Sequence, residues 1–172
     1  MDLEKIQLNW EEILSGGLTG MLRQTESMRQ NISWGHNANF NLYDKWGMTI
    51  SGSLCEMALA KKMSSYFGHT VNNFHGSDLI IDNKCVQVRS QLMTKKSNNL
   101  IIRQGYKKTD YYFLVGDDTP TYRFFGYIAP LDIEKHGQWT NFNKTDRPYV
   151  WSVPIDKLKP LKQFKYEKHT HK

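Results

Sequence analysis

The residues best suited to chemistry in this chain lie in one short stretch, SDLIIDNKCVQVR at positions 77–89. Two runs rich in Leu, Ile and Val meet at the polar turn signal DNK, a pattern typical of a β-hairpin. Asp78 stands at the start of the first run, and the second run carries Gln87 and Arg89. Carboxylate and amide oxygens bind hard cations, and a guanidinium binds phosphate, so the hairpin is the candidate site.

The face on which each of these side chains lies depends on the turn. If the loop consists of Asn83 and Lys84, Asp78 lies opposite Arg89, and Asp78, Gln87 and Arg89 share one face because side chains alternate along a strand. A three-residue loop would break this parity. The other face is apolar and is predicted to lie in the core; it consists of Leu79, Ile81, Val86 and Val88.

A second acid, Glu56, belongs to a predicted helix over residues 51–67. It lies on the apolar stripe of that helix, which is formed by Leu59, Ala60, Met63 and Phe67. A buried carboxylate is costly unless a cation or hydrogen-bond donors satisfy it. The alternative is that Ser53 and Glu56 form a capping box at the start of the helix.

This order of elements resembles the PD-(D/E)XK nuclease superfamily, the restriction-endonuclease-like fold, over residues 46–129. Glu56 and Asp78 match that family's acids by position, and Gln87-Val88-Arg89 falls on its Glu-x-Lys triplet, with glutamine and arginine as departures. The strands also resemble those of uncharacterised proteins encoded by bacteriophages. The resemblance implies an α/β fold whose restriction-endonuclease-like core is a mixed β-sheet of about five strands flanked by helices.

The same resemblance implies a metal-dependent DNA endonuclease that leaves a 5′-phosphate. Mg²⁺, or Mn²⁺ as a substitute, would be held by Asp78, the main-chain carbonyl of Val88 and Glu56, the last either directly or through water. Gln87 would offer a neutral and weaker oxygen. Arg89 would stand where the family's lysine positions water and stabilises the phosphorane, but arginine is always charged and cannot act as a base.

Two other interpretations remain open. The summed charge of the site is one unit less negative than in the family, which has three acids and a lysine where this chain has Asp78, Glu56 and Arg89. A metal ion would therefore bind more weakly. The fold could then serve DNA binding or inhibition without catalysis. In the third interpretation the chain is an unrelated mixed α/β protein in which Asp78 and Arg89 form a structural cross-strand ion pair.

Composition favours an anionic partner. The chain has 172 residues, 39% of them hydrophobic, and a formal net charge of +6, which fit one domain and a DNA partner. The candidate DNA contacts are Lys95, Lys96, Arg103, Lys107 and Lys108. Whether the chain forms a homodimer or a higher homo-oligomer is left open.

The two cysteines, Cys55 and Cys85, have the spacing of neither a zinc site nor a disulfide framework, so free thiols are expected. No apolar run is long enough to span a membrane, and the N-terminus lacks the order of a secretory signal. We therefore expect a cytoplasmic protein, in the host cytoplasm if a phage encodes it.

The rest of the chain divides into a helical extension at 1–45, a core at 46–135 and a C-terminal segment with a basic tail at 136–172. The extension is predicted to hold two helices, 2–14 and 18–32, separated at Gly16-Gly17, and then a long loop to residue 46. The second helix has an apolar side and a polar side that carries Arg23, Gln24 and Arg29, for which a solvated face is the favoured interpretation. Expected strands are 70–74, 100–103, 110–115 and 122–129, with a turn at 116–118 and a short helix from Pro130 to His136. A polar segment and then an apolar one, 149–153, follow.

Overall fold

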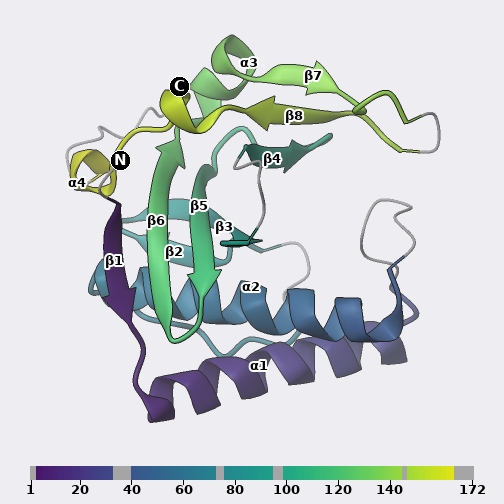
Figure 1. Ribbon diagram of the computed structural model, residues 1–172, viewed down its shortest axis with the longest axis vertical. Coiled ribbons are helices and arrows are strands. Elements are labelled where there is room, and N and C mark those ends of the chain that lie inside the picture. The colour runs from purple at the N-terminus through teal and green to yellow at the C-terminus, as the bar shows by residue number, and fades with distance from the viewer. Residues whose placement is uncertain (1–2, 33–39, 73–75, 95–98, 145–146, 165–172) are drawn as a thin grey trace.

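The computed structural model describes residues 3–32, 40–72, 76–94, 99–144 and 147–164. It is a mixed α/β protein in which two N-terminal helices pack on a five-stranded sheet, with a small three-stranded sheet on the other side (Figure 1). Lys95, Lys96 and His75 lie outside the described residues. No helix in the described ranges is long and apolar enough to cross a membrane.

The two long helices are α1 (Trp10–Arg29) and α2 (Leu42–Lys62). Each begins with a capping box, in which an asparagine side chain and an acid three residues later exchange hydrogen bonds with each other's backbone N–H groups. The pairs are Asn9 with Glu12 and Asn41 with Asp44. The loop between the helices is therefore shorter than predicted, because α2 begins at Leu42.

The prediction of two helices separated at Gly16-Gly17 is wrong, because α1 is continuous through both glycines. Glycine is needed where α1 touches α2: a Cβ atom on Gly20 would lie 2.7 Å from the Cα atom of Ile50. Residues 4–7, which were expected to be helical, instead form a strand at the edge of the large sheet.

The large sheet has the order β1-β6-β5-β3-β2. Its strands are β1 (Glu4–Gln7), β6 (Thr121–Ile128), β5 (Tyr111–Asp118), β3 (Lys84–Leu92) and β2 (Leu79–Ile81). Strands β3 and β5 are parallel and the other neighbours are antiparallel, so the sheet is mixed as expected. The turn predicted at 116–118 is wrong, since β5 continues to Asp118. Thr70–Asn72 lie in no strand, whereas 73–74 fall outside the described residues.

The hairpin of β2 and β3 is present, but its register differs by two residues from the prediction. Its loop is Asp82 and Asn83, with φ of 48° and 58°, and Ile81 pairs with Lys84. Asp and Asn tolerate the left-handed region that such a tight turn requires, whereas lysine does so rarely. A shift of two preserves parity, so the predicted apolar face is confirmed and lies in the core: Leu79, Ile81, Val86 and Val88.

The small sheet has the order β4 (Leu100–Arg103), β8 (Val150–Val153) and β7 (Gln138–Thr140). Neighbouring residues of β5 point in opposite directions: Phe113 packs with α2, whereas Tyr112 packs with the small sheet. The two long helices therefore cover one face of the large sheet, while the small sheet and the short helix α3 (Ile133–His136) pack on the other, and the prediction of a sheet flanked by helices holds in part. Short turns of helix complete the chain at η1 (Pro130–Asp132), α3 (Ile133–His136), η2 (Ile155–Lys157) and α4 (Leu161–Phe164).

The two glycines Gly20 and Gly17 offer a matched test of the α1–α2 contact. We expect Gly20→Ala to destabilise the protein by about 1–3 kcal/mol, since its methyl group would meet the backbone of Ile50. An added Cβ on Gly17 has nothing within 4 Å, so Gly17→Ala should stabilise the helix by up to about 1 kcal/mol. Chemical denaturation of both variants measures the difference, and equal stabilities would contradict the packing described.

Candidate functional site

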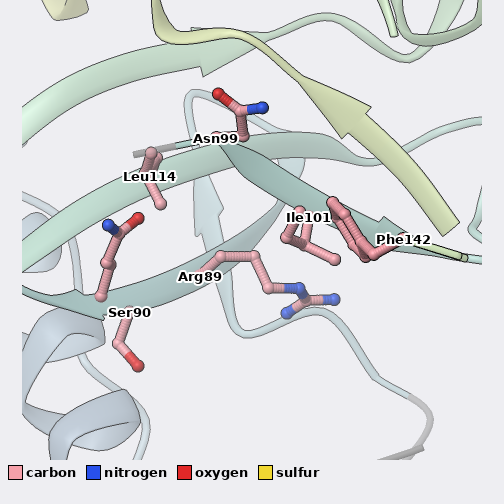
Figure 2. A pocket seen from close by; sticks show the side chains of 7 residues that line it. Arg89, Ser90, Asn99, Ile101, Leu114 and Phe142 are labelled. Carbon is pink, nitrogen blue, oxygen red and sulfur yellow. The ribbon is translucent and has the colours of Figure 1, made fainter. Parts of the chain in front are cut away.

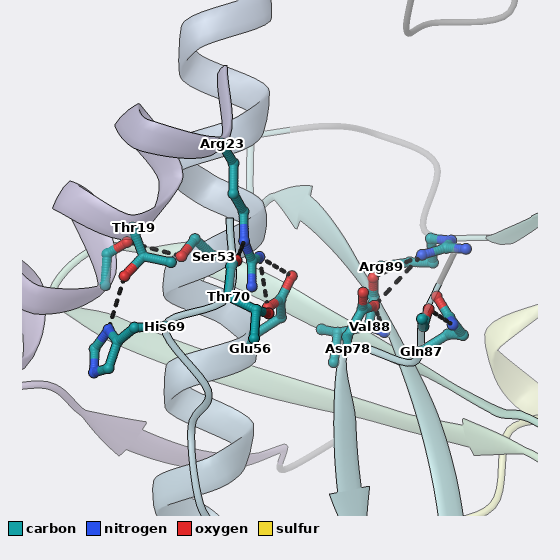
Figure 3. Close-up of polar contacts among 12 residues, drawn as sticks. Thr19, Arg23, Ser53, Glu56, His69, Thr70, Asp78, Gln87, Val88 and Arg89 are labelled. Carbon is teal, nitrogen blue, oxygen red and sulfur yellow. Dashed lines mark hydrogen bonds and ion pairs between the residues drawn. The ribbon is translucent and has the colours of Figure 1, made fainter. Parts of the chain in front are cut away.

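Asp78 lies immediately before β2, where the strand pairing ends. Its backbone N–H donates to the carbonyl of Val86 at 2.9 Å, and its Oδ2 accepts the N–H of Val88 at 2.7 Å (Figure 3). The side chain thus takes the place of a strand carbonyl and is held against β3. It is only half-buried, with 25% of the side chain exposed.

Arg89 is near Asp78, but it is not its directly opposed partner. Its Nη1 lies 3.8 Å from Oδ2 of Asp78, which is an ion pair without a hydrogen bond, and donates to the main-chain carbonyl of Val88 at 3.0 Å. The guanidinium also lies over the ring of Tyr112, 5.5 Å from its centroid. Asp78, the Val88 carbonyl and Arg89 are therefore brought together, as the sequence predicted.

Glu56 is buried and is held by an arginine from the other helix. Both of its carboxylate oxygens accept from Nη1 of Arg23, at 2.9 and 2.7 Å, while Nε of Arg23 donates to the carbonyl of Thr70 at 2.9 Å. The capping-box alternative is wrong, because Glu56 lies deep within α2 and Ser53 donates instead to the carbonyl of Gly16. Arg23 was expected on a solvated face of the helix. It follows Gly20 by three residues, and because residues three apart lie on the same side of a helix, this spacing indicates that Arg23 faces α2, as Gly20 does.

The charges of these groups act on one another. The pKa of Glu56 is raised to about 8: burial is the main cause, the charge of Asp78 adds to the rise, and Arg23 and Arg89 oppose it. Burial also raises the pKa of Asp78, against the effects of Arg89 and of the Val88 N–H. Two acids and two arginines, drawn from α1, α2 and the hairpin, thus form one charge cluster.

Gln87 does not join this cluster through a direct contact. Its Nε2 donates to the carbonyl of Gly76 at 3.1 Å and to Oδ2 of Asp110 at 2.9 Å, and Ser77 donates to the same oxygen. Its Cα partner on β5 is Tyr112, so Gln87 lies on the face that meets the small sheet. Asp110 was not predicted as a site residue. It is buried and lies just before β5, beside β3. The feature of the sequence that could have indicated it is an acid at the start of a predicted strand, as at Asp78.

A cleft of about 310 Å³ opens on the same face (Figure 2). Arg89 projects into it from β3, and Phe142 borders it from the segment between β7 and β8. Phe142 has a φ of 56°, a left-handed conformation that is rare for a bulky residue and often marks a functional segment. The remaining lining residues are Ser90, Gln91, Asn99, Ile101 and Leu114.

Among the predicted DNA contacts that the structure describes, Arg103 is affected by the charge of Arg89. Its pKa is lowered by loss of solvent and then by the charge of Arg89, so two guanidinium groups are near each other. Lys107 and Lys108 are exposed, and Lys108 lies 3.9 Å from Glu134. Both cysteines are free; Cys55 is buried, as expected, and Cys85 is half-buried.

Within the described residues, no group of three or more His, Cys, Asp and Glu side chains could hold a metal ion. The oxygen donors of the predicted site are two carboxylates, Asp78 and Glu56, which are close enough to affect each other's charge, and the main-chain carbonyl of Val88. Comparison of the chain with protein-family models, with curated proteins and with solved structures finds no match.

The raised pKa of Glu56 predicts a pH dependence of stability. An acid that holds its proton more tightly when folded makes the folded state less stable as pH rises, here from about 4.5 to about 8. Glu56→Gln removes this titration, so wild-type stability should fall more steeply than that of the variant, by at most about 1.4 kcal/mol per pH unit. Chemical denaturation at a series of pH values tests this, and parallel curves would refute it.

Proposed function

We propose that the protein is a metal-dependent DNA endonuclease with a restriction-endonuclease-like core, centred on Asp78. The observation that carries the proposal is the pair of acids Asp78 and Glu56: burial raises the pKa of both, and the charge of Asp78 adds to the rise at Glu56, whose pKa is about 8. Strongly shifted carboxyl groups are typical of functional sites, and carboxylate oxygens are the ligands that a hard divalent cation prefers.

The donors fit a hard cation in kind, since all are oxygens: one or both carboxylates and the main-chain carbonyl of Val88. When bound, Mg²⁺ would polarise the scissile phosphate and lower the pKa of a water molecule. Asp78 would supply the principal ligand, because one of its oxygens is used by the Val88 N–H and the other remains for a ligand. Glu56 would act through water or would first release one oxygen from Arg23.

Arg89 would bind the DNA phosphate. It lies between the Val88 carbonyl and the cleft, and its permanent charge suits an anion rather than a proton transfer. Arg103 adds a second positive charge nearby, and the net charge of +6 favours a polyanion. Phe142 offers an aromatic surface at the cleft, half exposed, on which a base could stack.

A second function, DNA binding without catalysis, is favoured by one observation. Arg23 already satisfies both oxygens of Glu56, and the amide of Gln87 is used by Asp110, so the chain itself neutralises much of the site. In that case the same cleft and basic side chains would hold DNA while no cation is bound.

The endonuclease proposal predicts cleavage of plasmid DNA with Mg²⁺ or Mn²⁺ and none in EDTA. Asp78→Ala should lower the rate at least 100-fold while the folded structure, checked by circular dichroism, is retained. Asp156→Ala, which removes an exposed aspartate on η2, should leave the rate unchanged. Cleavage that survives in Asp78→Ala would overturn the assignment, and DNA binding without cleavage at every metal concentration would favour the second function.

The placement of DNA at the cleft has its own test. Arg103→Ala should weaken DNA binding and lower the slope of log affinity against log salt by about 1, because one phosphate contact is lost. Arg123→Ala is the matched control: Arg123 lies on β6 and is paired with Asp118, whereas Arg103 is near enough to Arg89 for that charge to lower its pKa. Fluorescence anisotropy in EDTA measures binding without cleavage. Equal salt slopes for the two variants would show that DNA does not contact Arg103.

A further inference from the structure

Helix α1 packs on α2 with its polar side facing inward. The side that packs on α2 buries small and polar residues, namely Gly16, Thr19, Gly20, Gln24 and Ser27. The opposite side exposes large apolar residues along the whole helix: Trp10 (82% exposed), Leu14 (72%), Leu18 (52%), Met21 (48%), Leu22 (47%) and Met28 (47%). We call these six residues the α1 stripe. Its exposure is the reverse of what an amphipathic helix in a monomer adopts.

Specific contacts fix this orientation. The hydroxyl of Thr49 on α2 donates to Oε1 of Gln24 at 3.0 Å, and Thr19 hydrogen-bonds with Nδ1 of His69 at 2.8 Å. Rotation of α1 to bury the stripe would break these bonds, separate Arg23 from Glu56 and drive large side chains into the close contact at Gly20. The exposed stripe is thus built into the fold.

The helix forms the outermost layer of the structure, beyond α2, and among the described residues nothing covers the stripe (Figure 1). Its 20 residues extend about 30 Å. Apolar patches on monomers rarely exceed a few hundred Å², whereas a standard interface buries about 800 Å² per partner. Six large side chains, each about half or more exposed, offer apolar surface of that order.

We propose that the α1 stripe is a self-association surface on which α1 of a second copy of this chain packs antiparallel, forming a two-fold symmetric dimer. This inference does not depend on the proposed nuclease activity. In such a pair, Leu18 of one copy meets Met21 of the other near the two-fold axis, and Trp10 meets Met28. Methionine and aromatic side chains pack favourably against each other.

The charges beside the stripe support this partner and this direction. Glu11 and Arg29 are both exposed and lie about five helical turns apart, so they flank the same edge of the stripe. A two-fold axis perpendicular to the helices keeps that edge on the same side of the interface. It therefore brings Glu11 of each copy beside Arg29 of the other, whereas in a parallel pair the same edges of the two copies lie on opposite sides of the interface and these charges do not meet.

A membrane surface is a poorer partner for the same residues. Helices that lie on membranes carry Lys and Arg beside their apolar side and leave a strongly polar side to water. The exposed residues of α1 include one base, Arg29, one acid, Glu11, and no lysine, and the polar side of α1 is buried on α2. The stripe thus has the charge balance of a protein–protein interface.

Sedimentation or light scattering of the full chain tests the proposal. The wild type should have twice the 20.2 kDa chain mass at micromolar concentration, and Leu14→Glu should be monomeric there, with a dissociation constant raised at least 100-fold. Leu131→Glu is the matched control, because Leu131 on η1 is 69% exposed and lies outside the stripe; it should stay dimeric. A monomeric wild type, or equal masses for the two variants, would overturn the proposal.

The direction of the pair is tested by charge exchange. Glu11→Arg and Arg29→Glu should each weaken the dimer several-fold, and the double variant should recover it, because the exchanged charges meet again across the two-fold axis. A double variant weaker than either single variant would exclude the antiparallel pair. Binding of the wild type to vesicles of anionic lipid, lost in Leu14→Glu, with no dimer in solution, would assign the stripe to a membrane instead.

Discussion

The close contact between α1 and α2 at Gly20 is the constraint on which the rest of the arrangement depends. Only a residue without a Cβ allows the helix backbones to approach where Gly20 meets Ile50. This contact fixes the rotation of α1 about its own axis. The rotation in turn decides which side chains of α1 reach α2, among them Arg23, and which are left outside as the α1 stripe.

That rotation has an electrostatic consequence in the protein interior. Glu56 lies on a side of α2 whose neighbours Cys55, Ala58 and Leu59 are fully buried, so its carboxylate needs a partner. Arg23 supplies it from α1, and the Thr70 carbonyl holds the guanidinium in place. The orientation that satisfies Glu56 thereby requires the apolar side of α1 to remain outside, which links the interior ion pair to the proposed dimer surface.

Local patterns in the sequence predicted the hairpin and its buried face well, because alternation survives a register shift of two residues. The loop itself was misplaced by one residue: the prediction put Lys84 in the turn, whereas Asp82 and Asn83, which tolerate positive φ, form it. The same alternation placed Asp78 and Arg89 on one face, whereas Glu56 came from the apolar stripe of a predicted helix and the Val88 carbonyl from the resemblance to the nuclease superfamily. The orientation of α1 could not be predicted from the sequence. An apolar stripe is expected to face the core, and only the tertiary contact at Gly20 turns this stripe outward. For the same reason Arg23 and Asp110, which act through residues distant in the chain, were missed.

Under the proposed function, the charge balance of the site would couple metal and DNA binding. Asp78 and Glu56 are compensated in this structure by Arg89 and Arg23, so the cluster is close to neutral and gains little from a cation. A phosphate that engages Arg89 through the cleft would remove part of this compensation from Asp78. The two acids would then be under-neutralised, and the affinity for a divalent cation would rise. By thermodynamic reciprocity a bound cation would strengthen DNA binding by the same factor, so a weak metal site would fill chiefly in the presence of substrate.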